Sequence, residues 1–245
     1  MNIKKHVPNL LTLGNLFCGT VATIFAVQGE FVSVAFLVVL GILFDFLDGF
    51  VARLLHISGE LGKQLDSLAD MVTSGVVPGI VMFQLIGHSG IKNFDFHHPF
   101  KIDSFYQDIR LLGLLLTLAA CYRLAKFNID TRQTDSFIGL PTPAMSLFVI
   151  SLPLIVEFSD YSFAINLIQN NYFLVGITLV LSFLMNAELP LFSLKFKEYS
   201  VKNNLLKYVF LLATVILIFT LQYLSIPLII VLYVVLSIVN NYGKK

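Results

Sequence analysis

The sequence predicts an all-α protein: a polytopic bundle of about eight transmembrane helices, with both chain termini on the cytoplasmic side. Three observations predict this fold. Of the 245 residues, 57% are hydrophobic and 13% are charged, and the mean hydropathy is +0.84, which excludes an ordinary soluble globular domain. The apolar residues are gathered into blocks close to the about 20 residues that a helix needs to cross the hydrocarbon. We expect a single membrane domain over residues 1–245.

The apolar blocks follow one another along the whole chain, each predicted to be one helix. They cover residues 8–27, 31–52, 67–87, 110–127, 140–158, 172–188, 205–222 and 225–241. Gly29 and Glu30 separate the first two blocks. The segment 54–61, which contains His56 and Gly59, separates the second block from the third, and these residue types are typical of turns.

Prolines mark the start of two later helices. Pro141 and Pro143 stand where the fifth block begins, and Pro227 stands near the start of the eighth. Proline is tolerated in the first turn of a helix because the backbone N–H there has no intrahelical partner. The longest polar interruptions, 88–109 and 189–204, are predicted to be loops.

The basic residues predict the orientation of the helices. With a cytoplasmic N-terminus, all of the 16 Lys and Arg residues except Lys92, Lys101 and Arg110 fall on the cytoplasmic side. This bias follows the positive-inside rule and favours an even number of spans. A formal net charge of +1 gives no argument for nucleic acid as a partner. We expect an integral protein of the cytoplasmic membrane.

Four carboxylates interrupt the second and third apolar blocks. They belong to the run Asp45-x2-Asp48-Gly49-x2-Ala52-Arg53-x8-Gly62-x3-Asp66-x3-Asp70. An ionised Asp at the centre of a spanning helix costs about 2.5–3.5 kcal/mol, so four of them require a compensating positive charge. Helical periodicity places Asp45 and Asp48 on one face, and Asp66 and Asp70 on one face of the next helix. Because the segment between is short, we expect antiparallel neighbouring helices with converging carboxylates.

Carboxylate oxygens are the ligands that Mg²⁺ and Mn²⁺ prefer, and a cluster of four has room for two ions. No His or Cys stands at a spacing that favours zinc. A single Asp near a helix end is often a cap or an interfacial residue. All four in register with small residues favour a metal site instead. Gly49 and Ala52 leave space for a ligand beside the carboxylates, and Arg53 can bind a phosphate with its forked guanidinium.

The run from Asp45 to Asp70 resembles the signature of the CDP-alcohol phosphotransferase family, D-x2-D-G-x2-A-R-x8-G-x3-D-x3-D, at every fixed position. The resemblance implies that Asp45, Asp48, Asp66 and Asp70 bind two divalent cations, Mg²⁺ or Mn²⁺. It implies that Asp70 is also the general base and that the reaction has no covalent enzyme intermediate. A homodimer is a further implication of this resemblance.

The same resemblance implies a site for a CDP-linked lipid. Its lining would consist of Gly49, Ala52, Arg53 and Gly62. Thr12 and Asn15, in the first block, can reach either the nucleotide or the outer shell of the metals. Polar residues of this kind can equally serve only to hydrogen-bond a neighbouring helix, and both interpretations stay open.

Three segments resemble the phosphatidylserine synthase branch of that family: 8–19, 67–78 and 139–144. The likeness covers most of the first 145 residues. It implies transfer of the phosphatidyl group from CDP-diacylglycerol to L-serine, with CMP as the second product. Arg123, Lys126 and Asn128 close the fourth block, and we hypothesise that Arg123 or Lys126 pairs with the serine carboxylate. The alternative is ordinary anchoring to anionic lipid headgroups.

Two other functions are compatible with the pattern. A sister enzyme of the same family would use glycerol 3-phosphate or an inositol phosphate, but a phosphorylated acceptor requires a denser basic pocket. A cation transporter would carry acidic residues deeper along a path formed by broken helices. Here the carboxylates gather at one rim, which favours the transferase.

Overall fold

The computed structural model describes residues 6–57, 59–88, 109–130, 138–192 and 204–242. The predicted all-α class is confirmed, since regular structure in these ranges is helical apart from one isolated antiparallel bridge between Ile138 and Pro190. The elements are α1 (Val7–Gln28), α2 (Phe31–Leu54), α3 (Glu60–Asp70), η2 (Met71–Val76), α4 (Val77–His88), η4 (Ile109–Leu114), α5 (Leu115–Ile129), α6 (Thr142–Phe158), α7 (Ser162–Ile168), α8 (Asn171–Asn186), α9 (Leu205–Leu221), η5 (Gln222–Leu224) and α10 (Ser225–Tyr242). Element η2 is a π-helix, whereas η4 and η5 are 3₁₀-helices.

Each predicted apolar block falls mainly on one helix or on one continuous helical run, the third on α3, η2 and α4 together. Four helical stretches are long and apolar enough to cross a membrane: Val7–Gln28, Phe31–Leu54, Glu60–Gly87 and Leu205–Asn241. A fifth is obtained if α7 and α8, which meet at 77°, count as one span. The chain is a polytopic helical membrane protein, and the number of eight spans stays a prediction. Lys92, Lys101 and most of the two predicted long loops lie outside the described residues.

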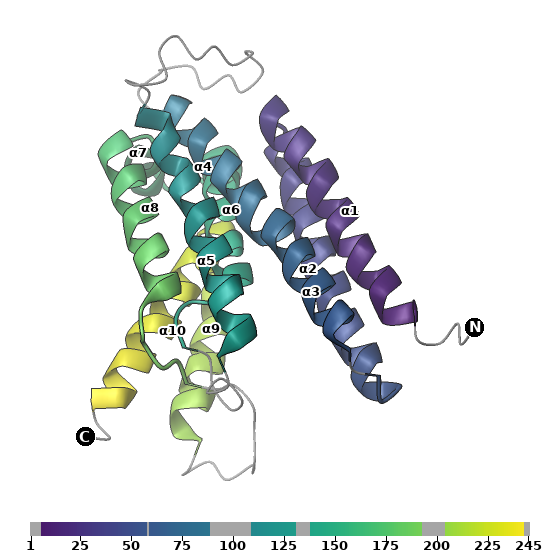
Figure 1. Ribbon diagram of the computed structural model, residues 1–245. Helices are drawn as coiled ribbons and strands as arrows, with labels where there is room; N and C mark the ends of the chain where they lie inside the picture. The colour runs from purple at the N-terminus through teal and green to yellow at the C-terminus, as the bar shows by residue number, and fades with distance from the viewer. Residues whose placement is uncertain (1–5, 58, 89–108, 131–137, 193–203, 243–245) are drawn as a thin grey trace.

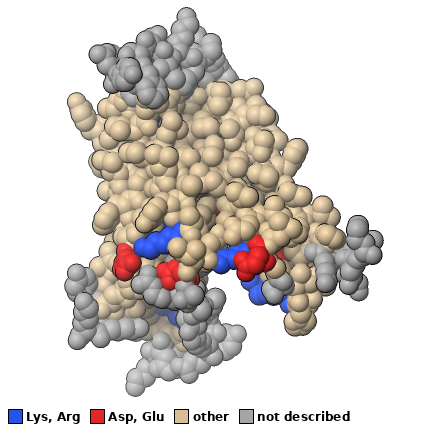
Figure 2. Space-filling model, in the orientation of Figure 1, with Lys and Arg blue, Asp and Glu red and all other residues tan. Residues whose placement is uncertain are grey.

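The helices stand side by side, and several of their ends share one end of the bundle (Figure 1). Helix α1 begins there, α10 ends there, and the turn between α2 and α3 lies there as well. Figure 2 shows that the Lys, Arg, Asp and Glu side chains visible on this face gather toward that end, below a broad uncharged band. On this face, the visible charged groups therefore lie toward one predicted membrane surface. That this surface is the cytoplasmic one remains a prediction.

A compact chain reversal connects α2 to α3. The N–H of His56 donates to Arg53 O at 3.1 Å and the N–H of Ile57 donates to Ala52 O at 2.9 Å. This pair of bonds is a Schellman motif, with His56 in the left-handed position (φ 53°) that glycine usually occupies. The motif ends α2 at Leu54 and keeps the connection between the two helices that carry the carboxylates short.

Helices α1, α2 and η2 pack with almost no space between their backbones. A Cβ placed on Gly19 would lie 2.9 Å from Thr73 Cα, and a Cβ placed on Gly41 would lie 2.8 Å from Asn15 Oδ1. Glycine at both positions is therefore required for this close approach, as in other membrane helix contacts. This packing holds α1 against α2 and against η2, which follows Asp70.

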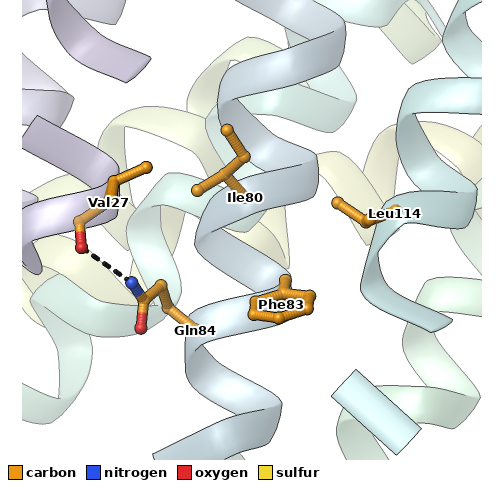
Figure 3. A pocket seen from close by; sticks show the side chains of 5 residues that line it. All are labelled: Val27, Ile80, Phe83, Gln84 and Leu114. Carbon is orange, nitrogen blue, oxygen red and sulfur yellow. Dashed lines mark hydrogen bonds between the residues drawn. The ribbon is translucent and has the colours of Figure 1, made fainter. Parts of the chain in front are cut away.

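An apolar cavity lies along α4, away from the Asp residues of the motif (Figure 3). Gln84 Nε2 donates to Val27 O at 3.0 Å and joins α4 to α1. Beside this bond, a cavity of about 200 Å³ is lined by Val27, Ile80, Phe83, Gln84 and Leu114. With a rise of 1.5 Å per residue, Gln84 lies about 20 Å along the helical run from Asp70. The cavity is therefore separate from the acidic residues.

Candidate functional site

Three of the four predicted carboxylates form a compact cluster. Asp45 and Asp48 on α2 and Asp66 on α3 each offer one oxygen atom, and these oxygens all lie within 4.8 Å of one another. Asp48 is only 7% exposed. Three ionised carboxylates at this separation repel one another strongly in a partly buried setting, so a bound cation would stabilise them. The donor set consists of hard oxygen atoms, and it fits Mg²⁺ or Mn²⁺.

Asp70 lies beside the cluster and is not one of its three members. It is one helical turn beyond Asp66, and it is close enough to Asp66 and Asp45 to interact with them electrostatically. Asn15 Nδ2 donates to Asp70 Oδ1 at 3.1 Å. Asp70 is thus held by an amide from α1 and stands on the inner side of the other carboxylates. This position suits a group that acts on a substrate bound next to the metals.

Helix α1 supplies hydrogen bonds to two of the carboxylates. Thr12 Oγ1 donates to Asp48 Oδ2, as Asn15 does to Asp70. Thr12 and Asn15 are 4% and 0% exposed, and their spacing of three residues places them on one face of α1. These bonds are compatible with both interpretations left open above, because they reach the carboxylates and also join α1 to two neighbouring helices. A direct contact of either residue with a nucleotide remains a prediction.

The small residues of the motif lie around the carboxylates as follows. A Cβ on Gly49 would lie 3.7 Å from Arg53 Nη1, so the Arg53 guanidinium lies against this glycine. A Cβ on Gly62 would lie 3.4 Å from Asn9 Oδ1 on α1. Helices α2 and α3 both pack against α1 more extensively than against each other, which differs from the expected side-by-side pair. Helix α1 therefore forms most of the packing that holds α2 and α3, and the carboxylates still meet within 4.8 Å.

The structure separates the three residues predicted to bind the acceptor. Arg123 is 7% exposed, its Nη2 donates to Gly139 O at 3.4 Å, and its charge interacts with Asp70. Lys126 forms an ion pair with Glu188 at 3.4 Å. Asn128 Nδ2 donates to Ser67 Oγ at 2.8 Å. Arg123 is therefore a buried cation within electrostatic range of Asp70, whereas Lys126 and Asn128 bond to Glu188 and Ser67.

The π-helix η2, which begins directly after Asp70, was not predicted from the sequence. Thr73 Oγ1 donates to Asn15 O at 3.1 Å, and Thr117 Oγ1 donates to Gly75 O at 3.0 Å. These two hydroxyls tie η2 to α1 and α5. Single π-helical turns are frequent at functional sites because they change the direction in which following side chains point. Apolar periodicity does not distinguish a π-helix from an α-helix over six residues, so no sequence signal was available.

The chain was compared with known families and proteins. The family described as CDP-alcohol phosphatidyltransferase matches residues 5–186. A CDP-diacylglycerol–serine O-phosphatidyltransferase of Helicobacter pylori strain J99 is 34% identical over 145 residues, which are 58% of this chain and 55% of the relative. The enzyme of the same description from Bacillus subtilis is 29% identical over 152 residues, or 60% and 75% of the two chains. An archaetidylserine synthase of Methanothermobacter thermautotrophicus is 30% identical over 184 residues, 72% of each chain.

Proposed function

The chain belongs to the CDP-alcohol phosphatidyltransferase family, and from this premise we propose that it transfers the phosphatidyl group of CDP-diacylglycerol to the hydroxyl of L-serine. The products are phosphatidylserine and CMP. The observation that carries the proposal is the cluster of Asp45, Asp48 and Asp66 next to Asp70. Serine as acceptor is supported by relatives whose names specify serine or archaetidylserine. The match spans about half the length of the Helicobacter pylori relative.

The acidic residues have two roles in this proposal. Asp45, Asp48 and Asp66, together with Asp70, would hold two divalent cations, Mg²⁺ or Mn²⁺. When bound, these ions supply positive charge to the pyrophosphate of the donor and to the departing CMP. Gly49 and Gly62 leave space beside the carboxylates, Ala52 lines the same face of α2, and Arg53 binds a phosphate at the headgroup level.

Asp70 is the proposed general base. Its carboxylate accepts the proton of the serine hydroxyl as the hydroxyl oxygen attacks the phosphorus atom that carries diacylglycerol. The new bond joins the serine oxygen to this phosphorus, and the bond between phosphorus and the CMP oxygen breaks. Asn15 orients the carboxylate through its hydrogen bond to Oδ1, and Thr12 does the same for Asp48.

Arg123 is the proposed partner of the serine carboxylate. It is buried, it faces Asp70, and its Nε has no hydrogen-bond partner among the described residues. An acceptor bound between Arg123 and Asp70 would place its hydroxyl near the base and its carboxylate on the guanidinium. Lys126 and Asn128 remain predicted contributors, although each is already engaged with another residue.

We expect Arg123→Ala to raise the KM for L-serine about 10-fold or more, because a hydrogen bond to a charged group is worth about 1.5–3 kcal/mol. The KM for CDP-diacylglycerol should change less than about twofold, since the donor is held by other residues. Steady-state kinetics in detergent with each substrate varied in turn would measure both constants. Lys207→Ala, which removes a partly exposed cation of α9 that has no proposed role in binding, is the control. Two unchanged constants for Arg123→Ala would mean that Arg123 serves only the packing of α5.

The activity itself is tested by CMP release from CDP-diacylglycerol with the purified protein and Mg²⁺ or Mn²⁺. L-serine, glycerol 3-phosphate, inositol phosphate and no acceptor are compared. Metal-dependent release that serine alone stimulates, with formation of the serine-headgroup lipid, supports the proposal. Release that only another alcohol stimulates would retain the family and reject serine. No release with any acceptor would reject the transferase proposal and favour the cation transporter.

The proposed setting is the cytoplasmic membrane, with the site open to the cytoplasm. The asymmetric distribution of Lys and Arg supports this orientation, and a cytoplasmic opening would give CMP and serine direct access to water. The homodimer implied by the family resemblance stays a prediction.

A further inference from the structure

Two buried serine hydroxyls lack the partner that most other hydroxyls of this protein have. Ser and Thr side chains within membrane helices usually donate to a carbonyl of the preceding turn. Thr178 donates to Leu174 O and Ser151 donates to Phe148 O, both at 2.7 Å. Ser74 and Ser146 are 0% exposed, and neither Oγ has a hydrogen-bond partner within the described residues. A buried hydroxyl without a partner is costly, so it indicates a missing ligand or water.

Both serines belong to elements that surround Asp70. Ser74 follows Asp70 by four residues, so it lies about one turn further along the helical run that α3 and η2 form. Ser146 lies on α6, which contacts η2. Ser182 and Thr214 also have unpartnered hydroxyls, but their helices α8 and α9 make no extensive contact with α3 or η2.

Arg123 lies on α5, which packs against η2. A Cβ on Gly75 would lie 3.2 Å from Ala120 Cβ, which places α5 directly against η2 one turn before Arg123. The Arg123 Nε, like the two serine hydroxyls, has no partner in the described part of the chain. Three unpartnered buried polar groups therefore belong to η2, α5 and α6, which pack against one another, and η2 begins directly after Asp70.

We propose that Ser74, Ser146 and Arg123 form the acceptor subsite, which binds a small zwitterionic hydroxy amino acid. The inference rests on the proposed function and specifies how its second substrate is recognised. The two hydroxyl oxygens accept hydrogen bonds from the substrate ammonium, and Arg123 binds the carboxylate. One guanidinium and two neutral hydroxyls match an acceptor with a single negative charge. A phosphorylated alcohol carries more negative charge, and the nearby Lys126 and Lys63 are already bonded to Glu188 and to Asn128 O.

We expect Ser74→Ala and Ser146→Ala each to raise the KM for L-serine about 5-fold, the loss of one hydrogen bond to a charged group. The values of kcat and of the KM for CDP-diacylglycerol should stay within about twofold. Ser151→Ala is the matched control, because it removes a buried hydroxyl of α6 that is already satisfied. Unchanged KM values for serine, with or without a lower unfolding temperature, would overturn the proposal and indicate that an internal water meets these hydroxyls.

Substrate analogues test the assignment of each group. Used as competitive inhibitors, 3-hydroxypropionate lacks the ammonium and ethanolamine lacks the carboxylate. The serine substitutions should weaken ethanolamine but leave 3-hydroxypropionate unaffected, and Arg123→Ala should do the reverse. The opposite pattern, or equal effects on both analogues, would contradict the subsite as described.

The failure of this inference can be told apart from failure of the proposed function. If the unchanged protein releases CMP only with another alcohol, serine is the wrong acceptor, and the KM of that alcohol is compared across the same variants. A rise with Ser74→Ala and Ser146→Ala would retain the place of the subsite but reject a zwitterionic ligand, and no rise would reject the subsite itself. If no acceptor stimulates release, both proposals are overturned.

Discussion

Replacing Asp48 by Asn is expected to lower metal-dependent CMP release by about 10³-fold, while the metal-free protein becomes no less stable. The loss corresponds to ~4 kcal/mol of charge stabilisation in the transition state. Stability should move in the other direction, because Asp48 shares its site with Asp45 and Asp66 within 4.8 Å. Without metal, removing one of three neighbouring negative charges relieves their repulsion. The Asn side chain keeps an oxygen that can accept from Thr12.

Thermal unfolding in detergent, with and without Mn²⁺, measures this pair of effects. The unchanged protein should unfold at a higher temperature when Mn²⁺ is present, because a ligand that binds only the folded state stabilises it. Asp48→Asn should lose most of this increase. Glu60→Gln, which removes an exposed carboxylate from the start of α3 outside the cluster, should retain it. An Asp48→Asn protein that keeps both its activity and its response to Mn²⁺ would refute the metal site.

The local part of the site could be predicted because it depends on helical period. Asp45 and Asp48 are three residues apart on α2, and Asp66 follows a short connection. Helical period and the chain reversal therefore bring the three carboxylates together, although α2 and α3 pack mainly against α1. The same reasoning identified the start of α6 at Pro141 and the place of Pro227 in the first turn of α10. These features arise from neighbours in sequence, and the structure confirms them.

The parts that could not be predicted depend on contacts between distant segments. Arg123 and Lys126 end the same helix and look equivalent in the sequence, yet one is buried beside Asp70 and the other pairs with Glu188. Which of them faces inward is decided by the packing of α5 against η2. The π-helix could not be predicted either, because it is held by hydrogen bonds to distant helices. Thr73 donates to α1, and Thr117 on α5 donates to η2. Sequence spacing contains no information on such pairs.

A second large effect is expected at Asp70. Asp70→Asn should lower kcat by about 10²–10⁴-fold, the contribution that a positioned general base makes. Binding of CDP-diacylglycerol and of at least one cation should persist, because Asp70 is not among the three carboxylates that lie within 4.8 Å of one another. The fold should also persist, since the Asn side chain can still accept the hydrogen bond from Asn15 Nδ2.

The number of bound Mn²⁺ ions separates the two roles proposed for Asp70. If Asp70 is both base and ligand, the Asn variant should bind one ion where the unchanged protein binds two. If it is a base alone, both ions should remain while kcat still falls. Asp160→Asn, an exposed carboxylate beyond the far end of α6, should change neither quantity and serves as the control. A full kcat in Asp70→Asn would reject the base assignment and would require another residue to accept the proton of the attacking hydroxyl, because a neutral alcohol is a weak nucleophile toward phosphorus.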